Sequence, residues 1–205
     1  MLLFLGGMIS GFLALLLNHS VEKFTLFWPD EVLPKISFFG ESIPLFSSVF
    51  WFCVGFNEEL AKLIVLLLLV YPTKHITEEY DGILYAVTIA VGFATMENFY
   101  YLDQYGIAVV ITRTVITIPA HAFMSVPMGY FASKSRLCLE NNSSSRLRFC
   151  LAVGTLIIGW FLSSFLHGLY DFLLSFNMEN IAYLQILFMG ALSILISKFA
   201  LRSTK

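Results

Sequence analysis

The sequence has 205 residues, of which 58% are hydrophobic and only 13% are charged, and its mean hydropathy is +0.81. Soluble domains contain about 25% charged residues and need polar surface to cover their cores. The composition therefore excludes a soluble enzyme and predicts an all-α membrane protein, a polytopic bundle of helices. The formal net charge of −2 offers no basic surface for nucleic acid.

Six apolar stretches are long enough, or nearly so, to cross a bilayer as helices, which takes about 20 apolar residues. They are residues 2–17, 43–71, 81–102, 106–131, 148–176 and 180–200. The first has no preceding Lys or Arg and no following cleavage site, so we interpret it as a retained span rather than a signal peptide. We expect one domain over residues 1–205.

The second and fifth stretches are longer than a bilayer requires. Breaks in them would raise the number of segments from six to as many as eight. The residues at which we expect such breaks are Gly55 and Asn57 in the second stretch and Ser163, Ser164 and Gly168 in the fifth.

The basic residues in the short loops predict the orientation of the chain. Loop 132–147 and the C-terminal tail are rich in Lys and Arg and are separated by two spans, so both are expected in the cytoplasm. Counting back places loop 72–80 and the N-terminus on the same side. Loop 18–42 is then outside, where Trp28, Pro29 and Pro34 indicate a segment at the membrane interface.

Ionisable side chains interrupt four of the apolar stretches. On insertion scales a central Asp, Lys or Arg costs about 2.5–3.5 kcal/mol, and residues of this kind inside a membrane predict a functional site. The candidates are Glu58, Glu59 and Lys62 in the second stretch, Glu97 and Asn98 in the third, Arg113 and His121 in the fourth, and His167 and Asp171 in the fifth.

Helical spacing limits which of these side chains can meet. Lys62 lies four residues after Glu58 and three after Glu59, so it can pair with either carboxylate, and the spacing does not decide between them. If Glu58 takes the lysine, Glu59 is left to act as a base. His167 and Asp171 are four residues apart, so the carboxylate can orient the imidazole and fix its tautomer.

Two carboxylates and two histidines can support peptide hydrolysis with or without a metal. In the metal-free version Glu58 or Glu59 activates a water held by His121, and His167 donates to the oxyanion. In the zinc version Glu59, His121 and His167 are the ligands and a fourth position stays open for water. We favour the metal-free version, because no two histidines have the spacing of four residues common in helical zinc sites.

The motifs resemble, in order, those of the PrsW family of intramembrane proteases. They are Glu58-Glu59-x-x-Lys62, Asp81-Gly82-x-x-Tyr85, Gly92-Phe93-Ala94-x-x-Glu97-Asn98-x-x-Tyr101, His121 and His167-x-x-x-Asp171. They span about residues 56–171 and are more distantly similar to the superfamily of CAAX prenyl endopeptidases and bacteriocin-processing enzymes. That superfamily usually has Asn where Asp171 stands.

The resemblance implies a helical protease of a prokaryotic plasma membrane that cuts a single-span, membrane-anchored protein. In the founding members the substrate is an anti-sigma factor, cut on its extracytoplasmic side. The resemblance also implies that Glu58, Glu59 and His121 are essential and that His167 is the second histidine. The family is often described as metalloproteases, whereas its prenyl-processing relatives resemble metal-independent glutamate proteases, so the resemblance leaves zinc or no cofactor open.

Other interpretations remain open at this point. An ion- or proton-coupled transporter would use the same carboxylates and histidines as a relay, but it would be expected to show inverted repeats, which the sequence lacks. An inactive relative would act as a scaffold. Each polar group also has a structural interpretation, such as an ion pair on one helix, or Glu97 and Asn98 marking the outer end of a span.

Overall fold

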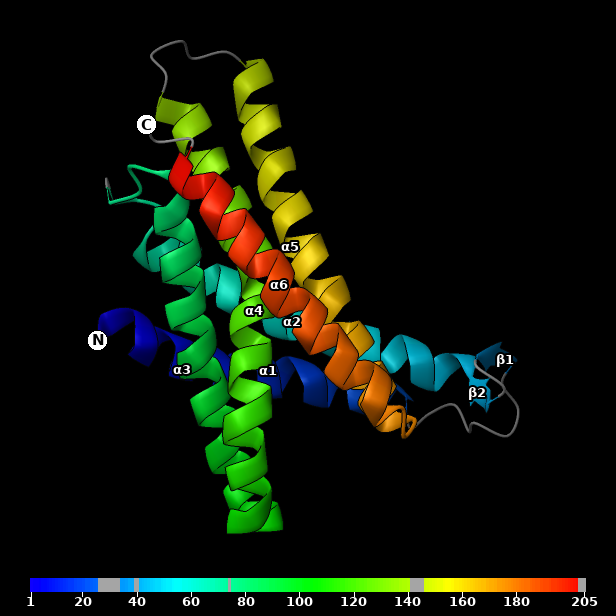
Figure 1. The fold of residues 1–205 in the computed structure, drawn as a ribbon. Helices are drawn as coiled ribbons and strands as arrows, with labels where there is room; N and C mark the ends of the chain where they lie inside the picture. Colours follow the sequence, from blue (N-terminus) through cyan, green and yellow to red (C-terminus); the bar gives the residue numbers. More distant parts are fainter. Residues whose placement is uncertain (26–33, 39–40, 74, 141–145, 203–205) are drawn as a thin grey trace.

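The computed structural model describes residues 1–25, 34–38, 41–73, 75–140 and 146–202. This part of the chain forms six helices and one short hairpin, so the prediction of an all-α fold with six helices is confirmed (Figure 1). The helices are α1 (Leu2–Thr25), α2 (Leu45–Leu69), α3 (Glu79–Tyr105), α4 (Ile107–Glu140), α5 (Arg146–Ser175) and α6 (Glu179–Arg202).

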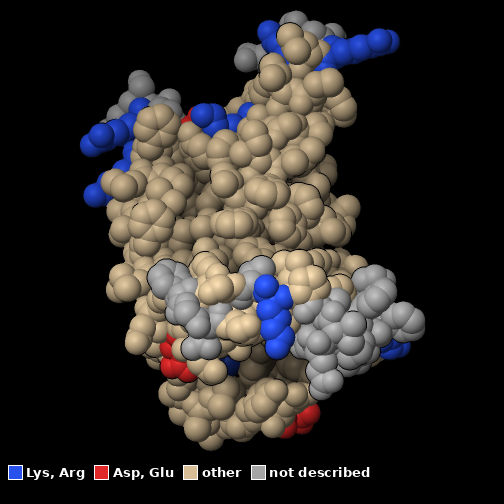
Figure 2. Space-filling model, turned by 90° about the vertical axis from the view of Figure 1, so that its right-hand side faces the viewer, with Lys and Arg blue, Asp and Glu red and all other residues tan. Residues whose placement is uncertain are grey.

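The helices form a membrane protein with several spans. Within the described residues, five of them (α1 and α3 to α6) are long and apolar enough to cross a bilayer. The remaining helix, α2, is 25 residues long and apolar apart from Glu58, Glu59 and Lys62 near its middle. Figure 2 shows several Lys and Arg at one end of the molecule, above a broad band of that face without charged side chains, and further basic and acidic side chains below the band.

The connections alternate between the two ends of the bundle. The C-terminal ends of α4 and α6 lie at the same end of the molecule as the start of α5, whereas the end of α3 and the start of α4 lie at the opposite end (Figure 1). Because the first two carry the predicted basic segments, this arrangement agrees with placing both on one side of a bilayer.

The region between the first two helices differs from the predicted loop 18–42. Residues 18–25 continue α1, and strands β1 (Lys35–Phe38) and β2 (Glu41–Pro44) pair antiparallel before α2 begins at Leu45. Pro34 precedes β1, and its carbonyl accepts a hydrogen bond from the Leu45 N–H over 2.9 Å. Trp28 and Pro29 lie outside the described residues.

The predicted breaks in the second and fifth stretches are wrong, because α2 and α5 are continuous helices. Gly55 of α2 lies directly against Gly168 of α5, where a Cβ at Gly55 would clash with the Gly168 backbone nitrogen. A Cβ at Gly168 would in turn lie 2.7 Å from the Phe52 Cα. The two glycines thus allow the backbones of α2 and α5 to touch, next to Glu58, Glu59 and His167.

Small residues bring α1 and α3 equally close. A Cβ at Gly7 would clash with the Ile89 carbonyl, and one at Gly92 would clash with the Phe4 carbonyl. Ala90 and Ala94, on either side of Gly92, are also fully buried. The contact between α1 and α3 places the C-terminal half of α1 beside the part of α3 that carries Glu97.

Two hydrogen bonds with neighbouring helices attach α4 around Pro127, close to His121. Because proline has no N–H, the Phe123 carbonyl lacks its usual helical partner, and it accepts instead from Ser193 Oγ of α6 at 3.2 Å. The next residue, Met128, donates its N–H to Ser163 Oγ of α5 at 3.0 Å. Ser163, which the sequence suggested as a break, is therefore a helix-to-helix contact.

The contact between Gly55 and Gly168 predicts opposite effects of the same substitution at two glycines. We expect Gly55→Ala to lower the midpoint of thermal unfolding in detergent micelles, because overpacking at a backbone contact costs about 1–3 kcal/mol. The Cβ of Gly154→Ala, on α5, would meet nothing within 4 Å. That variant should keep or raise the midpoint, because Ala is favoured over Gly in a helix by about 0.5–1 kcal/mol. Equal midpoints for the two variants would contradict the interpretation.

Candidate active site

Helix α2 carries a fully buried ion pair. Lys62 Nζ lies 2.6 Å from Glu59 Oε1, and neither side chain is exposed. Of the two pairings that the spacing allowed, the structure has the one between residues three apart. Glu59 is therefore the carboxylate that pairs with Lys62. Glu58, which is 8% exposed, does not form this ion pair and faces the candidate site.

Lys62 also connects α2 to His121 of α4. Its Nζ lies 3.1 Å from His121 Nδ1 and 4.2 Å from the centre of the Phe93 ring. An ammonium group can only donate hydrogen bonds, so it makes Nδ1 the acceptor and leaves the proton of a neutral imidazole on Nε2. His121 Nε2 then donates to Glu97 Oε2, 3.0 Å away.

His167 of α5 is oriented chiefly by Glu59. Its Nδ1 lies 2.9 Å from Glu59 Oε1, whereas its Nε2 lies 3.6 Å from Asp171 Oδ2. Asp171 is on the predicted face of the helix, but Glu59 makes the shorter contact. A carboxylate that accepts from Nδ1–H fixes the orientation of the imidazole, and this orientation places Nε2 3.4 Å from Glu58 Oε2.

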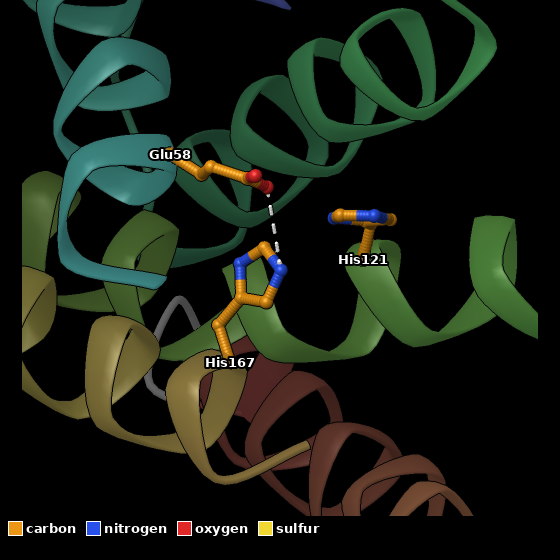
Figure 3. Close-up of side chains that lie close together, drawn as sticks. All are labelled: Glu58, His121 and His167. Atoms are coloured by element: carbon orange, nitrogen blue, oxygen red, sulfur yellow. Dashed lines mark ion pairs between the residues drawn. The ribbon is translucent and has the colours of Figure 1, made fainter. Parts of the chain in front are cut away.

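Glu58, His121 and His167 could hold a metal ion. Figure 3 shows the three side chains converging from α2, α4 and α5, and one ligand atom from each lies within 4.8 Å of the others. One carboxylate and two imidazoles with an open fourth position are a ligand set typical of catalytic zinc. The ligand types therefore fit a zinc ion, and all three residues are buried.

The grouping in the structure differs at one position from the zinc ligand set expected from the sequence. The expected set contained Glu59, but Glu59 Oε1 is engaged by Lys62 and His167, and its Oε2 accepts from Ser125 Oγ at 3.3 Å. With both oxygens occupied inside the protein, Glu59 supports the histidine and the lysine. Glu58 is the carboxylate that the structure groups with His121 and His167.

Glu97 and Asn98 belong to the site and do not mark the end of a span, since α3 continues to Tyr105. Glu97 Oε2 pairs with Arg113 Nη2 at 2.8 Å, and Asn98 Oδ1 accepts from Arg113 Nε at 3.1 Å. The Arg113 guanidinium lies over the Tyr101 ring, 3.6 Å from its centre. The sequence singled out Arg113 as an intramembrane charge but assigned it no role.

Asn18 of α1 is a site residue that the sequence analysis missed. Its Nδ2 donates to Glu58 Oε1 at 3.2 Å, and its Oδ1 accepts from Asn57 Nδ2 at 3.1 Å. The only sequence signals were an amide at the end of the first apolar stretch and another beside Glu58. Neither indicated that α1 touches the carboxylate, because the two residues are 40 positions apart.

A model of one protein family matches residues 1–197, almost the whole chain, and its description reads "PrsW family intramembrane metalloprotease". The chain belongs to the PrsW family.

Curated members of the PrsW family named "Protease PrsW" are similar to this chain. The Bacillus subtilis (strain 168) protein is 36% identical over 135 residues, which are 66% of this chain and 57% of that protein. The Clostridioides difficile (strain 630) protein is 33% identical over 175 residues, 83% of this chain and 65% of that protein. The matched region thus spans less than two thirds of these relatives. No solved structure matches the chain.

The structure explains how residues of the PrsW motifs, scattered along the sequence, come together. The motif residues of four helices contact one another, either directly or through Lys62 and Arg113. They are Glu58 and Glu59 of α2, Glu97 and Asn98 of α3, His121 of α4 and His167 of α5. Glu58 and Glu97 also line a cavity of about 350 Å³ between α1, α2 and α3. The candidate site therefore has a buried polar side and a side that borders this cavity.

The buried pair predicts a large effect of Lys62→Met on stability. Removing the lysine leaves Glu59 as an unpaired buried charge, which costs about 3–5 kcal/mol, so the midpoint of unfolding in micelles should fall sharply. Adding Glu59→Gln removes the second charge and should restore part of the loss. Lys134→Met is the control, because Lys134 is 41% exposed and lies 3.8 Å from Glu79; such a pair contributes about 0–1 kcal/mol. Similar losses from Lys62→Met and Lys134→Met would refute the role of Lys62.

Proposed function

We propose that this protein is an intramembrane endopeptidase that hydrolyses a peptide bond in a single-span, membrane-anchored protein. The observation that supports it best is the meeting of Glu58, His121 and His167 donor atoms from three helices, with Glu58 on the wall of a cavity. The PrsW relatives, which are named as proteases, give the same reaction class. A proton relay remains the other class of function, but it would not need three donor atoms to converge on one point.

We propose that Glu58, His121 and His167 hold a zinc ion. When bound, zinc supplies Lewis-acid polarisation of the peptide carbonyl and makes water a better nucleophile near neutral pH. Glu59 holds His167 in the tautomer with a free Nε2, and Lys62 fixes the position of Glu59. Partners that orient ligands in this way change metal affinity by about 10–100-fold when they are removed.

Glu97 is the residue that we assign to accept the proton of the attacking water. It lines the cavity, as Glu58 does, and Arg113 at 2.8 Å stabilises its charged form. The same proton can then pass to the amine that leaves when the peptide bond breaks, so the carboxylate is regenerated. In this assignment Arg113 and Asn98 keep Glu97 aimed at the cavity.

A metal-free version of the reaction is supported by the hydrogen bonds of His121, since both of its ring nitrogens have protein partners. In that version Glu58 accepts the proton from water, and His121 Nε2–H donates to the oxyanion as the carbonyl carbon becomes tetrahedral. The zinc version instead requires one nitrogen of His121 to exchange its present partner for the metal. The two versions thus differ in the role of the same histidine.

We further propose that the protein resides in a bacterial plasma membrane with both termini in the cytoplasm, and that its substrate resembles an anti-sigma factor. Several Lys and Arg lie at one end of the molecule, which supports the orientation (Figure 2). The bacterial origin of the PrsW relatives supports the location.

Cleavage of a co-expressed, tagged single-span protein tests the proposed function. Glu58→Gln and His167→Ala should each lower the rate of cleavage by at least about 100-fold, the low end of the contribution of an acid–base group. His75→Ala is the control, because His75 is exposed between α2 and α3, does not line the cavity and should not affect the rate. Immunoblotting of both tags gives the cleaved fraction at equal expression. Cleavage that persists in Glu58→Gln would refute the assignment.

Elemental analysis of purified protein distinguishes the two chemical versions without any substrate. The zinc version predicts stoichiometric zinc in the wild-type chain, its loss from Glu58→Gln and His167→Ala, and its retention in His75→Ala. It also predicts that a chelator abolishes cleavage and that added zinc restores it. An active preparation without zinc that is insensitive to chelator would establish the glutamate mechanism instead.

A further inference from the structure

One face of α1 forms a wall of the cavity beside the site. The lining residues of α1 follow helical spacing, which places them on a single face: Gly11, Ala14, Leu15, Asn18 and Glu22. Leu16 is not among them, and 70% of its surface is exposed on another side of the helix. Helices α2 and α3 form the other walls, with Glu58 and Glu97 facing the same space.

The polar groups of this cavity suit a stretch of peptide that is not helical. In a transmembrane helix the backbone groups are hydrogen-bonded to one another, so a segment must unwind before one of its peptide bonds can be attacked. Unwound backbone at membrane depth is tolerated only where protein or water satisfies it. The Asn18 amide, the Glu58 carboxylate and the Tyr100 hydroxyl line the cavity and can supply such partners.

The charged side chains among the described residues of the cavity wall are carboxylates. Glu22, Glu58 and Glu97 line it, and none of the described lining residues is Lys or Arg. The other side chains of the wall include six aromatic rings: Phe50, Trp51, Phe93, Tyr100, Tyr101 and Tyr105. Carboxylates repel an acidic side chain, whereas aromatic faces and carboxylates attract a cationic one.

We propose that the cavity between α1, α2 and α3 binds the unwound segment of a single-span substrate around the scissile bond, and that it selects segments without acidic residues there. This proposal rests on the proposed function and names the binding site that this function needs. Leu15, Asn18 and Glu22 of α1 then contribute to substrate recognition, although they lie outside the motifs that carry the family resemblance.

Photo-crosslinking tests the proposal without requiring cleavage. The probes are two synthetic polyleucine peptides, each long enough to form a single span. Both have a central Asn-Gly pair and a benzophenone next to it. One peptide has Lys beside this pair, and the other has Asp in the same place. The full chain in detergent micelles should crosslink to the Lys peptide about tenfold more than to the Asp peptide, a ratio equivalent to one decade in Kd. Mass spectrometry should locate the crosslinks on cavity residues of α1 and α3.

Filling the cavity provides the matched comparison. Leu15→Trp places a larger side chain in the cavity and should lower crosslinking of the Lys peptide by about tenfold, again one decade in Kd. Leu16→Trp makes the same change at the adjacent exposed position and should leave crosslinking unchanged. If Leu15→Trp unfolds, Leu15→Phe serves in its place, and Glu22→Gln should independently reduce the preference for Lys over Asp.

The outcomes separate this proposal from the proposed function. Selective crosslinking in the cavity by a protein that cleaves nothing would support the binding site and refute the protease. Cleavage of single-span substrates with unchanged crosslinking in Leu15→Trp would refute the binding site and leave the protease intact. Equal crosslinking of the Lys and Asp peptides would overturn the proposed selectivity.

Discussion

The Lys62–Glu59 ion pair is the interaction on which the rest of the site depends. Both side chains are fully buried, and each also contacts one histidine, Lys62 contacting His121 and Glu59 contacting His167. Such a pair contributes little to net stability, because desolvation offsets the attraction between the charges. Its value here is geometric: the pair contacts imidazoles on two other helices and so fixes their positions relative to α2.

The glycine and proline contacts bring the helices close enough for the ion pair to act. Gly55 and Gly168 let α2 and α5 touch near Glu58 and His167. On α4, the Met128 N–H donates to Ser163 of α5 and the Phe123 carbonyl accepts from Ser193 of α6. Between helices in a bilayer, close packing and interhelical hydrogen bonds replace the hydrophobic effect as the driving force. The donor atoms within 4.8 Å of one another are a consequence of these contacts.

The polar groups form a continuous path across the bundle, from Arg113 through Glu97, His121, Lys62, Glu59 and His167 to Glu58. Along it every carboxylate contacts an arginine, a lysine or a histidine, so each charged group has a partner inside a medium where an unpaired charge is costly. The path ends at the cavity, where Asn18 of α1 contacts Glu58. The arrangement places Glu58 and Glu97, which line the cavity, where a substrate could reach them. Glu59 and Lys62, which support the histidines, are fully buried.

The sequence by itself determined the class of fold and indicated most of the polar residues that the structure brings together. Long apolar stretches can satisfy their backbone groups in a bilayer only as helices, and ionisable residues such as Glu58, His121 and His167 stand out because they are costly there. Tertiary structure alone decided that Lys62 pairs with Glu59, since the residues three and four positions away are equally near on a helix. It also decided that Gly55 and Gly168 are contacts rather than breaks, and that Asn18 reaches Glu58. These features depend on which helices touch, and periodicity within one helix carries no information about the residue that faces it from another.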